Sequence, residues 1–438
     1  MDPVLVAAIV FLTLIAFLAS GLWVFLSLAV AAALTLFGIM DFSLERIGAI
    51  ASRIMVRSAS SWELAAVPMF IWMGEIMFRT DISERLFRGL TPLVRNIPGG
   101  LLHTNVLGST IFAAVSGSSS ATTATVGKIT TKELFERGYS ESLALGSLAG
   151  AGSLGLLIPP SIVLIIYGVL AEVSIAKLFI AGIMPGLAIA CLYAFYIGVR
   201  CIVNRDLAPR IPSSQDDNSY LSILRNLAPV IGLILVVLGS IYSGWATPSE
   251  AAAIGVFAAM SFAVASHQMT LEIFKSSIIN ALKTSCMVCS ILMCAAFLSS
   301  AIGYMHIPRD IALLIESLDV SPYVLIACLA FFFIVLGLFL DGISIIVMTL
   351  PITLPIIVQA GFDPVWFGIF LVVMIEIGLM TPPIGFNLFV IQGISNRSVG
   401  LIAWYAAPFF LLMCLAATLL VLFPSIALWL PSTLSGTG

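Results

Sequence analysis

Hydrophobic residues dominate this chain in long runs that short polar segments separate. Runs of membrane-spanning length recur from residue 3 to about residue 430, and about 20 consecutive apolar residues allow a helix to cross a bilayer. The run over residues 3–40 is too long for the core of a signal peptide and predicts two retained spans that meet near Gly21. The pattern therefore predicts a polytopic α-helical membrane protein.

Two of the apolar runs are interrupted by a pair of prolines. Pro159-Pro160 and Pro382-Pro383 lie 223 positions apart, about half of the 438-residue chain. Proline lacks the backbone donor that a helix needs and clashes with the preceding turn, so each pair ends a helix. In a membrane such a break is tolerated where the freed backbone is buried in protein or lines a polar cavity. Two breaks in corresponding halves indicate the binding site of a transporter.

The two halves share an order of elements, which indicates an internal repeat. Pro185 and Pro408 are also 223 positions apart, and the glycines of two predicted hairpin tips, Gly117 and Gly342, are 225 apart. Each half is predicted to contain two spans, an amphipathic segment, a third span, an amphipathic arm, a re-entrant hairpin, a Pro-Pro-broken helix and a final span. Because each half crosses the membrane an odd number of times, the two repeats are predicted to be inverted.

Predicted boundaries follow from this repeat. Repeat 1 covers residues 1–203. It is expected to hold scaffold spans over residues 1–80, an arm helix over 81–99, the hairpin with the broken helix over 100–173, and a final span over 176–203. In repeat 2, residues 221–438, the corresponding ranges are 221–303, 305–319, 321–394 and 399–430. Residues 204–220 are rich in proline and charge without an apolar face, which predicts a cytoplasmic linker.

Lys and Arg predict the orientation of the chain, because they are enriched in cytoplasmic loops. With the linker in the cytoplasm, both chain ends lie on the periplasmic side. Five of the 19 basic residues then fall outside, namely Arg46, Arg53, Arg57, Lys177 and Arg309. The first three lie in a segment whose apolar residues recur at helical spacing, which predicts a helix at the membrane interface.

Composition agrees with a membrane protein and excludes several classes of function. The chain is 61% hydrophobic and 9% charged, whereas soluble domains contain about 25% charged residues. Its basic residues are scattered and do not alternate with aromatic residues, so the sequence does not indicate nucleic-acid binding. No His-Glu-x-x-His, Gly-x-Ser-x-Gly or Walker A motif occurs, so we expect no enzyme. Cys286 and Cys289 lack a second cysteine pair, which predicts inert thiols and no cofactor.

The first predicted hairpin tip, within residues 116–123, combines glycine with hydroxyl side chains. Hydroxyls and the carbonyls at half-helix ends are neutral oxygen ligands for a small cation such as Na⁺, and half-helix N-termini attract anions. Alternatively, these small residues only allow close helix packing. The helix break over residues 155–160 in the same half favours a site.

Carboxylates mark the second half of the chain. Asp341 follows an apolar run, and a carboxylate at such depth is expensive in a membrane and indicates function. Asp341 either ligates a cation or, as we slightly favour, accepts hydrogen bonds from the backbone of the hairpin tip. Glu376 precedes the second break and is either a proton or cation site or a structural group. Glu75 is assigned to scaffold packing or a subunit interface.

Five ordered blocks of residues resemble the large membrane subunit of TRAP transporters, the tripartite ATP-independent periplasmic transporters of the DctM family. The blocks span essentially the whole chain and are residues 116–119, 150–162, 244–251, 341–344 and 376–385. The resemblance implies an elevator-type, Na⁺-coupled transporter of the bacterial inner membrane that takes up an organic acid, usually a carboxylate. It also implies a periplasmic substrate-binding protein and a separate small four-helix membrane subunit, because this chain starts directly with the large subunit's first spans.

Carried onto this chain, the resemblance implies two Na⁺ sites and a substrate site between the hairpin tips. The first Na⁺ site would comprise Ser116, Gly117, Ser118, Ser119, Gly152 and Gly155. The second would comprise Asp341, Gly342, Ser344, Gly378 and Thr381. The substrate would contact Ser118, Ser119, Thr381, Pro382 and Asn387, with Glu376 as a candidate coupling carboxylate.

This chain departs from the family pattern at one place. The family is often acidic after the first Ser-Gly-Ser, whereas this chain has Ser120-Ala121, so no carboxylate ligand is expected there. The alternative function is a stand-alone Na⁺- or H⁺-coupled dicarboxylate or citrate carrier of similar architecture, working without a binding protein.

Overall fold

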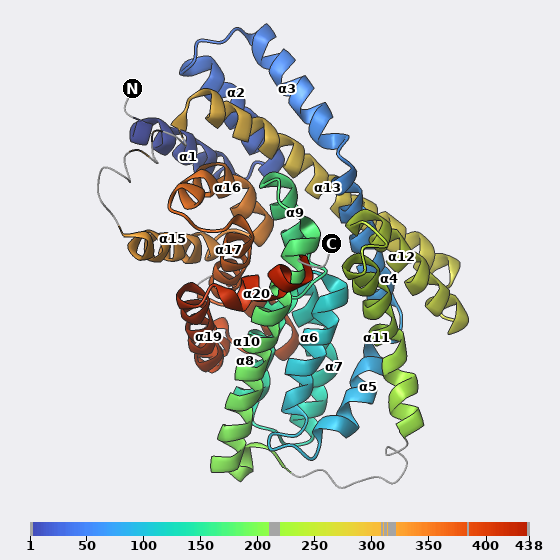
Figure 1. Ribbon diagram of the computed structural model, residues 1–438. Helices are drawn as coiled ribbons and strands as arrows, with labels where there is room; N and C mark the ends of the chain where they lie inside the picture. Colours follow the sequence, from blue (N-terminus) through green and yellow to red (C-terminus); the bar gives the residue numbers. More distant parts are fainter. Residues whose placement is uncertain are drawn as a thin grey trace.

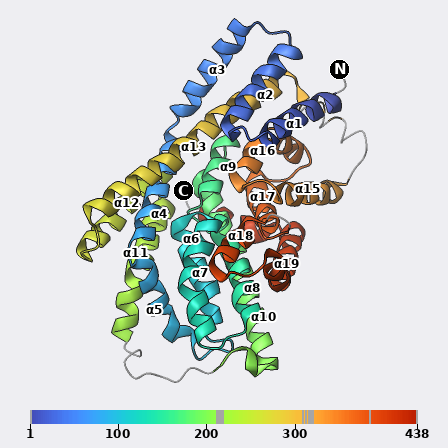
Figure 2. The same cartoon turned by 180° about the vertical axis from the view of Figure 1, so that it is seen from behind.

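The computed structural model describes residues 3–209, 220–307, 310, 313, 321–382 and 385–435. Within these ranges every regular element is a helix. Six helices of this described part are long and apolar enough to cross a membrane: α10, α11, α12, α13, α16 and α19. The chain therefore has the all-helical, polytopic membrane fold that its apolar runs predict (Figures 1 and 2).

The first half begins with two apolar helices that meet at Gly21, as expected. Its elements are α1 (Pro3–Ala19), α2 (Val24–Gly38), α3 (Leu44–Ala59), η1 (Trp62–Ala65), α4 (Ala66–Arg79), α5 (Ile82–Val94), α6 (Leu102–Ser116), α7 (Ser119–Glu136), α8 (Glu141–Gly152), η2 (Ser153–Leu156), α9 (Ile162–Leu170) and α10 (Ile175–Val203).

The second half follows the short turn η3 (Arg205–Leu207). Its helices are α11 (Tyr220–Tyr242), α12 (Pro248–Ala265), α13 (Leu271–Tyr304), α15 (Pro322–Gly337), α16 (Gly342–Gln359), α17 (Pro364–Leu379), α18 (Phe386–Ser395), α19 (Val399–Leu422) and α20 (Ser425–Ser435). Most of the predicted linker, most of the predicted arm over 305–319, and Pro383 lie outside the described residues.

Polar residues explain where several helices begin. The Ser174 hydroxyl accepts a hydrogen bond from Lys177 N at the start of α10 (3.4 Å). At α12, Thr247 and Glu250 form a reciprocal capping box, and Pro248 stands in the first turn. Each cap satisfies backbone donors that the helix leaves unpaired and stabilises the helix by about 1 kcal/mol.

One element of the second half differs from the predicted order. The sequence predicts an amphipathic segment and then a separate span before residue 303, as α3 and α4 form in the first half. The structure instead contains the single helix α13 of 34 residues. No proline or glycine lies between Leu271 and Leu298, so nothing in the chain ends the helix there.

The helices form two groups by their contacts. α13 packs along α2, α3 and α4, while α12 packs against α4 and α11; we call α1–α5 together with α11–α13 the wall. α6, α7 and α8 pack on one another, α8 packs on α19, and α15 packs on α17; we call α6–α10 together with α15–α20 the two-hairpin unit. Figure 1 shows α3, α12, α11 and α5 of the wall along the right-hand side of the molecule.

Each half contributes a helical hairpin and a broken helix to the two-hairpin unit. The first hairpin is α6–α7, and its broken helix runs through α8 and η2, with a break over residues 157–161 before α9. The second hairpin is α15–α16, and α17 is separated from α18 by residues 380–385. Both helix breaks that the prolines predict are therefore present. We call residues 116–119 the first tip and residues 338–342 the second tip.

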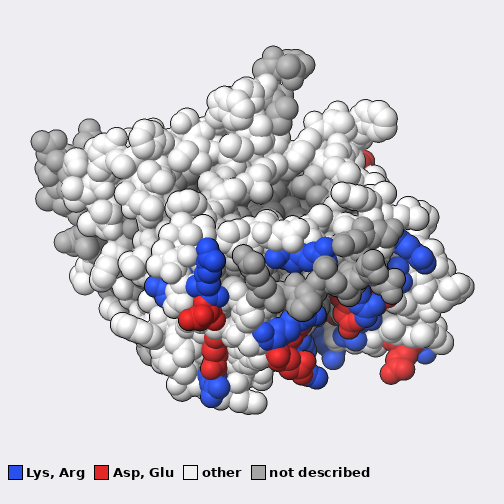
Figure 3. Space-filling view, turned by 90° about the horizontal axis from the view of Figure 1, so that it is seen from below, with Lys and Arg blue, Asp and Glu red and all other residues white. Residues whose placement is uncertain are grey.

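Charged side chains gather at the end of the molecule that is lowest in Figure 1 (Figure 3). α7 ends here with two ion pairs along its last turns, Arg137–Glu133 (2.7 Å) and Lys132–Glu136 (3.8 Å). The orientation rule assigns this end to the cytoplasm. The orientation in a membrane stays a prediction.

A partly buried hydrogen bond joins the two broken helices and offers a test of the packing. The Tyr167 hydroxyl of α9 donates to the carbonyl of Pro364, the first residue of α17 (2.6 Å). Tyr167→Phe removes this bond, while the Pro364 carbonyl keeps its backbone partner within α17, so we expect the free energy of unfolding to fall by about 0.5–1.5 kcal/mol. Thermal unfolding of the purified protein in detergent measures this effect, and an unchanged midpoint would contradict it.

Candidate transport site

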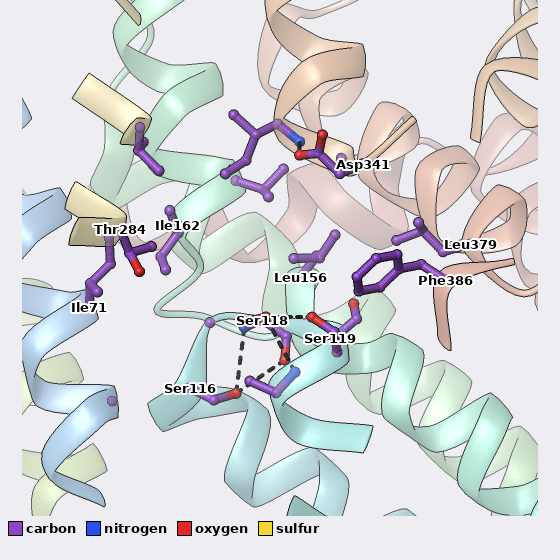
Figure 4. Close-up of a pocket in the computed structure, with 18 of the residues that line it drawn as sticks. Ile71, Ser116, Ser118, Ser119, Leu156, Ile162, Thr284, Asp341, Leu379 and Phe386 are labelled. Atoms are coloured by element: carbon purple, nitrogen blue, oxygen red, sulfur yellow. Dashed lines mark hydrogen bonds between the residues drawn. The ribbon is translucent and has the colours of Figure 1, made fainter. Parts of the chain in front are cut away.

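A cavity of about 380 Å³ lies where the two tips approach the wall. Its lining comes from α4 and α13 of the wall, from the two tips, and from η2, α9 and the start of α18. In Figure 4, Ser116, Ser118 and Ser119 lie on one side and Asp341 lies opposite them, while Thr284 belongs to the wall. Both halves of the chain therefore meet at this cavity.

The first tip turns at Gly117. This residue follows α6 with φ of +60°, a left-handed conformation that glycine adopts without steric cost. Ser118 then caps α7 by accepting a hydrogen bond from Ala121 N (3.4 Å). The Ser116 and Thr122 hydroxyls lie 2.7 Å apart and join the two arms of the hairpin. The Ser-Gly-Ser sequence thus builds a tight tip that carries hydroxyl groups.

The first helix break lies directly against this tip. A Cβ atom added at Gly155 would lie 2.6 Å from both Ser118 O and Ser119 N, which is too close for any side chain. Gly152 packs instead against α7, where an added Cβ would lie 2.0 Å from Thr123 Oγ1. Of the residues implied for the first Na⁺ site, Gly155 therefore meets the tip, while Gly152 lies in a helix-packing contact behind it.

Glu376 reaches from α17 of the second half to the first tip. Its carboxylate accepts hydrogen bonds from the Ser119 hydroxyl and from Leu156 N (3.1 Å). The residue is fully buried, and its Oε2 atom has no hydrogen-bond partner among the described residues. Glu376 stands beside the second break in the sequence, but its carboxylate lies at the first tip and the first break.

Asp341 caps α16 at the second tip. Its Oδ2 accepts hydrogen bonds from Ile343 N (3.1 Å) and Ser344 N (3.4 Å), and Oδ1 accepts one from the Ser344 hydroxyl. This is the local bonding that the sequence favoured for Asp341. Asp341 and Gly342 also line the cavity. A Cβ at Gly342 would lie 3.1 Å from the Leu156 side chain, so the second tip approaches the first break.

The other residues implied for binding lie around the second break. Gly378 packs on α15, where an added Cβ would lie 2.7 Å from Gly337 Cα. The Thr381 hydroxyl donates to a carbonyl one turn earlier (2.7 Å). Asn387 is fully buried and lines the cavity, and its amide has no hydrogen-bond partner in the described part of the chain. Thr381 and Pro382 are not among the described lining residues, so their contact with substrate stays a prediction.

Two polar wall residues reach the cavity without having been assigned to it from the sequence. Glu75 of α4 lines the cavity and pairs with Arg79 (3.1 Å). Its position in an apolar run was a signal of function, but that run did not show which way the side chain faces. Thr284 of α13 also lines the cavity. No sequence signal marks Thr284, because a single threonine in a long helix is ordinary.

Helix ends dominate the electrostatics of the cavity. The first turns of α7, α9, α16 and α18 contribute lining residues, and α6 and α17 end there. Helix starts carry partial positive charge that attracts anions, whereas carbonyls at helix ends attract cations. Among the described lining residues the charged ones are Glu75 and Asp341, with no Lys, Arg or His. The cavity can therefore hold an anionic group and compensating cations together.

These features define a membrane transport protein, since broken helices and hairpins bring polar groups to a cavity inside an apolar helical bundle. Residues 11–426 match the family described as the tripartite ATP-independent periplasmic transporter, DctM component. The chain belongs to this family, and it is a large permease component of such transporters. The relatives are transporter permease subunits and not enzymes.

Two relatives illustrate the range of the family. The chain is 33% identical to the C4-dicarboxylate TRAP transporter large permease protein DctM of Pseudomonas aeruginosa, over 93% of this chain and 94% of that protein. It is 35% identical to the ectoine TRAP transporter large permease protein TeaC of Halomonas elongata, over 86% of this chain and 87% of that protein.

A solved transporter shares the fold. The structure of the YdaH transporter of Alcanivorax borkumensis superposes with a TM-score of 0.64 over 88% of each chain, at 14% sequence identity. At this identity the likeness concerns the fold alone.

Proposed function

We propose that this permease carries a small organic acid, a carboxylate, into the cell together with Na⁺. The observation that carries the proposal is that four helix starts, two helix ends and two carboxylates meet at one cavity. The helix starts suit the carboxylate of a substrate, while carbonyls, hydroxyls and Asp341 suit Na⁺. The relatives named for C4-dicarboxylates and for ectoine support a small, charged organic substrate.

We place one proposed Na⁺ site at each of the two tips. The first lies at residues 116–119 together with Gly155, whose backbone is in contact with the first tip. The second comprises Asp341, Gly342 and Ser344 at the second tip together with Gly378 and Thr381 around the second break. The substrate lies between the tips, where Ser118, Ser119 and Asn387 line the cavity.

The proposed movement is an elevator displacement of the two-hairpin unit along the wall. Most wall residues at the cavity are apolar, namely Ile71, Phe78, Met287 and Val288. An apolar surface offers no fixed hydrogen-bond partners, so the unit can move along it at little cost. Na⁺ bound at both tips would hold them in the substrate-binding geometry, and this links ion binding to transport.

Two partners complete the proposed system. The family is described as tripartite, which supports a periplasmic substrate-binding protein that delivers the substrate and a small four-helix membrane subunit beside the wall. We place the permease in the bacterial inner membrane with both chain ends in the periplasm, because the basic residues then lie mainly in the cytoplasm.

Uptake by the reconstituted system tests the proposal. The permease, its small subunit and its binding protein are placed in proteoliposomes, and the small molecule that copurifies with the binding protein serves as the labelled probe. We expect uptake to require an inward Na⁺ gradient and to be lost when choline replaces Na⁺. Uptake by the permease alone would support the stand-alone carrier instead, and uptake driven by a proton gradient without Na⁺ would contradict Na⁺ coupling.

A further inference from the structure

The Glu376 carboxylate connects parts of the protein that are distant in the sequence. It contacts the Ser119 hydroxyl of the first tip across 257 positions and Leu156 N of the first break across 220 positions. Ser119 and Leu156 both line the cavity, whereas Glu376 lies directly behind them. The first tip and the first break are therefore held together by a side chain of the second half.

In its ionised form the Glu376 carboxylate has no compensating positive charge within the described part of the chain. Among the described residues, no Lys, Arg or His side chain forms an ion pair with Glu376. The residue is fully buried, and Oε2 lacks even a hydrogen bond within the described ranges. A buried carboxylate is costly unless a positive charge lies close to it. Two hydrogen bonds, one of them from a neutral hydroxyl, meet only part of this requirement.

A cation at the first tip would supply the missing positive charge. In a medium of low dielectric constant, the negative charge of Glu376, which contacts Ser119 of the first tip, attracts a cation at that tip strongly. The first tip has no carboxylate of its own, because Ser120 and Ala121 follow the Ser-Gly-Ser turn. The second tip, by contrast, carries Asp341. The first half therefore depends on the second half for its negative charge.

We propose that Glu376 is the positioning residue of the first cation site, so that a carboxylate of the second half sets the Na⁺ affinity of the first tip. The proposal rests on the Na⁺ coupling proposed above. Glu376 acts through Ser119 and Leu156: it holds the tip against the break, and its charge favours the cation that binds there. Each Na⁺ site then has one carboxylate, and both carboxylates belong to the second half of the chain.

Na⁺ titration of the purified permease, in complex with its small subunit, tests this assignment. The thermal midpoint is followed as NaCl replaces choline chloride at constant ionic strength, because a ligand that binds the folded state raises the midpoint. Glu376→Gln keeps the size and an acceptor oxygen but removes the charge. We expect the half-saturating Na⁺ concentration to rise at least about tenfold. Glu376→Asp keeps the charge on a shorter side chain, so its half-saturating Na⁺ concentration should lie between those of the wild type and of Glu376→Gln.

A second variant separates this effect from a general loss of folding. Ser119→Ala removes the hydroxyl that Glu376 holds, and it should raise the half-saturating Na⁺ concentration in the same direction. The double variant should show less than the sum of the two effects, because both changes break one contact. Glu84→Gln on α5 is the control, since Glu84 is exposed and pairs only with Arg88 among the described residues. It should leave the Na⁺ titration unchanged.

The outcomes distinguish this inference from the proposed function. If choline and Na⁺ stabilise the wild-type protein equally, Na⁺ coupling fails. If the wild type responds to Na⁺ and Glu376→Gln keeps its half-saturating concentration, the role of Glu376 is overturned while Na⁺ coupling stands, whatever Ser119→Ala shows. If Glu376→Gln does not fold, the Glu376→Asp titration decides between the same two results: a raised half-saturating Na⁺ concentration supports the role of Glu376, and an unchanged one overturns it.

Discussion

Replacing Gly155 with alanine is expected to abolish most transport while the protein still folds and inserts. The added methyl group would lie 2.6 Å from backbone atoms of Ser118 and Ser119, so the first tip and the first break must separate. Such overpacking costs about 1–3 kcal/mol. If the cost falls on the binding-competent arrangement, its population falls by about 5- to 150-fold. Na⁺-dependent uptake in proteoliposomes measures this loss.

A matched glycine provides the control for this experiment. Gly393 lies in α18, after the second break, and a Cβ added there would have no other atom within 4 Å. Gly393→Ala should therefore preserve uptake and, as a change to alanine within a helix, should not lower stability. Equal uptake by Gly155→Ala and Gly393→Ala would show that contact between the tip and the break is not needed for transport.

Asp341→Ala is expected to reduce uptake by at least about tenfold and to raise the half-saturating Na⁺ concentration by a similar factor. The change removes two things at once. One is the cap of α16, which is worth about 1 kcal/mol. The other is the negative charge that the second tip presents to the cavity. The uptake rate as a function of Na⁺ concentration measures the second effect, and thermal unfolding measures the first.

Asp363 separates these two roles. It caps α17 as Asp341 caps α16, by accepting hydrogen bonds from Val365 N (2.6 Å) and Trp366 N (3.2 Å). Asp363 is not among the described residues that line the cavity. Asp363→Ala should therefore lower stability by a similar amount and leave the Na⁺ dependence unchanged. If both variants show the same Na⁺ dependence as the wild type, Asp341 acts only as a helix cap.

Local sequence predicts much of the helical framework. The helix breaks at the two proline pairs and the turn at Gly117 all lie where the sequence predicts them, because proline and glycine restrict or permit backbone conformations within a few residues. The repeat failed as a guide for α13, where the analogy with the first half predicted two segments. That stretch contains no helix-ending residue before Gly303, so local chemistry outweighed the repeat.

The sequence by itself determined that this chain is a helical membrane protein with two broken spans, and its residue blocks indicated the family. Apolar runs, prolines and glycines act locally, so they can be read along the chain. Only the tertiary structure decided that Glu376 belongs with Ser119, 257 positions away, and that Glu75 faces the cavity. Such contacts depend on how whole helices pack against one another, which no short pattern of residues specifies.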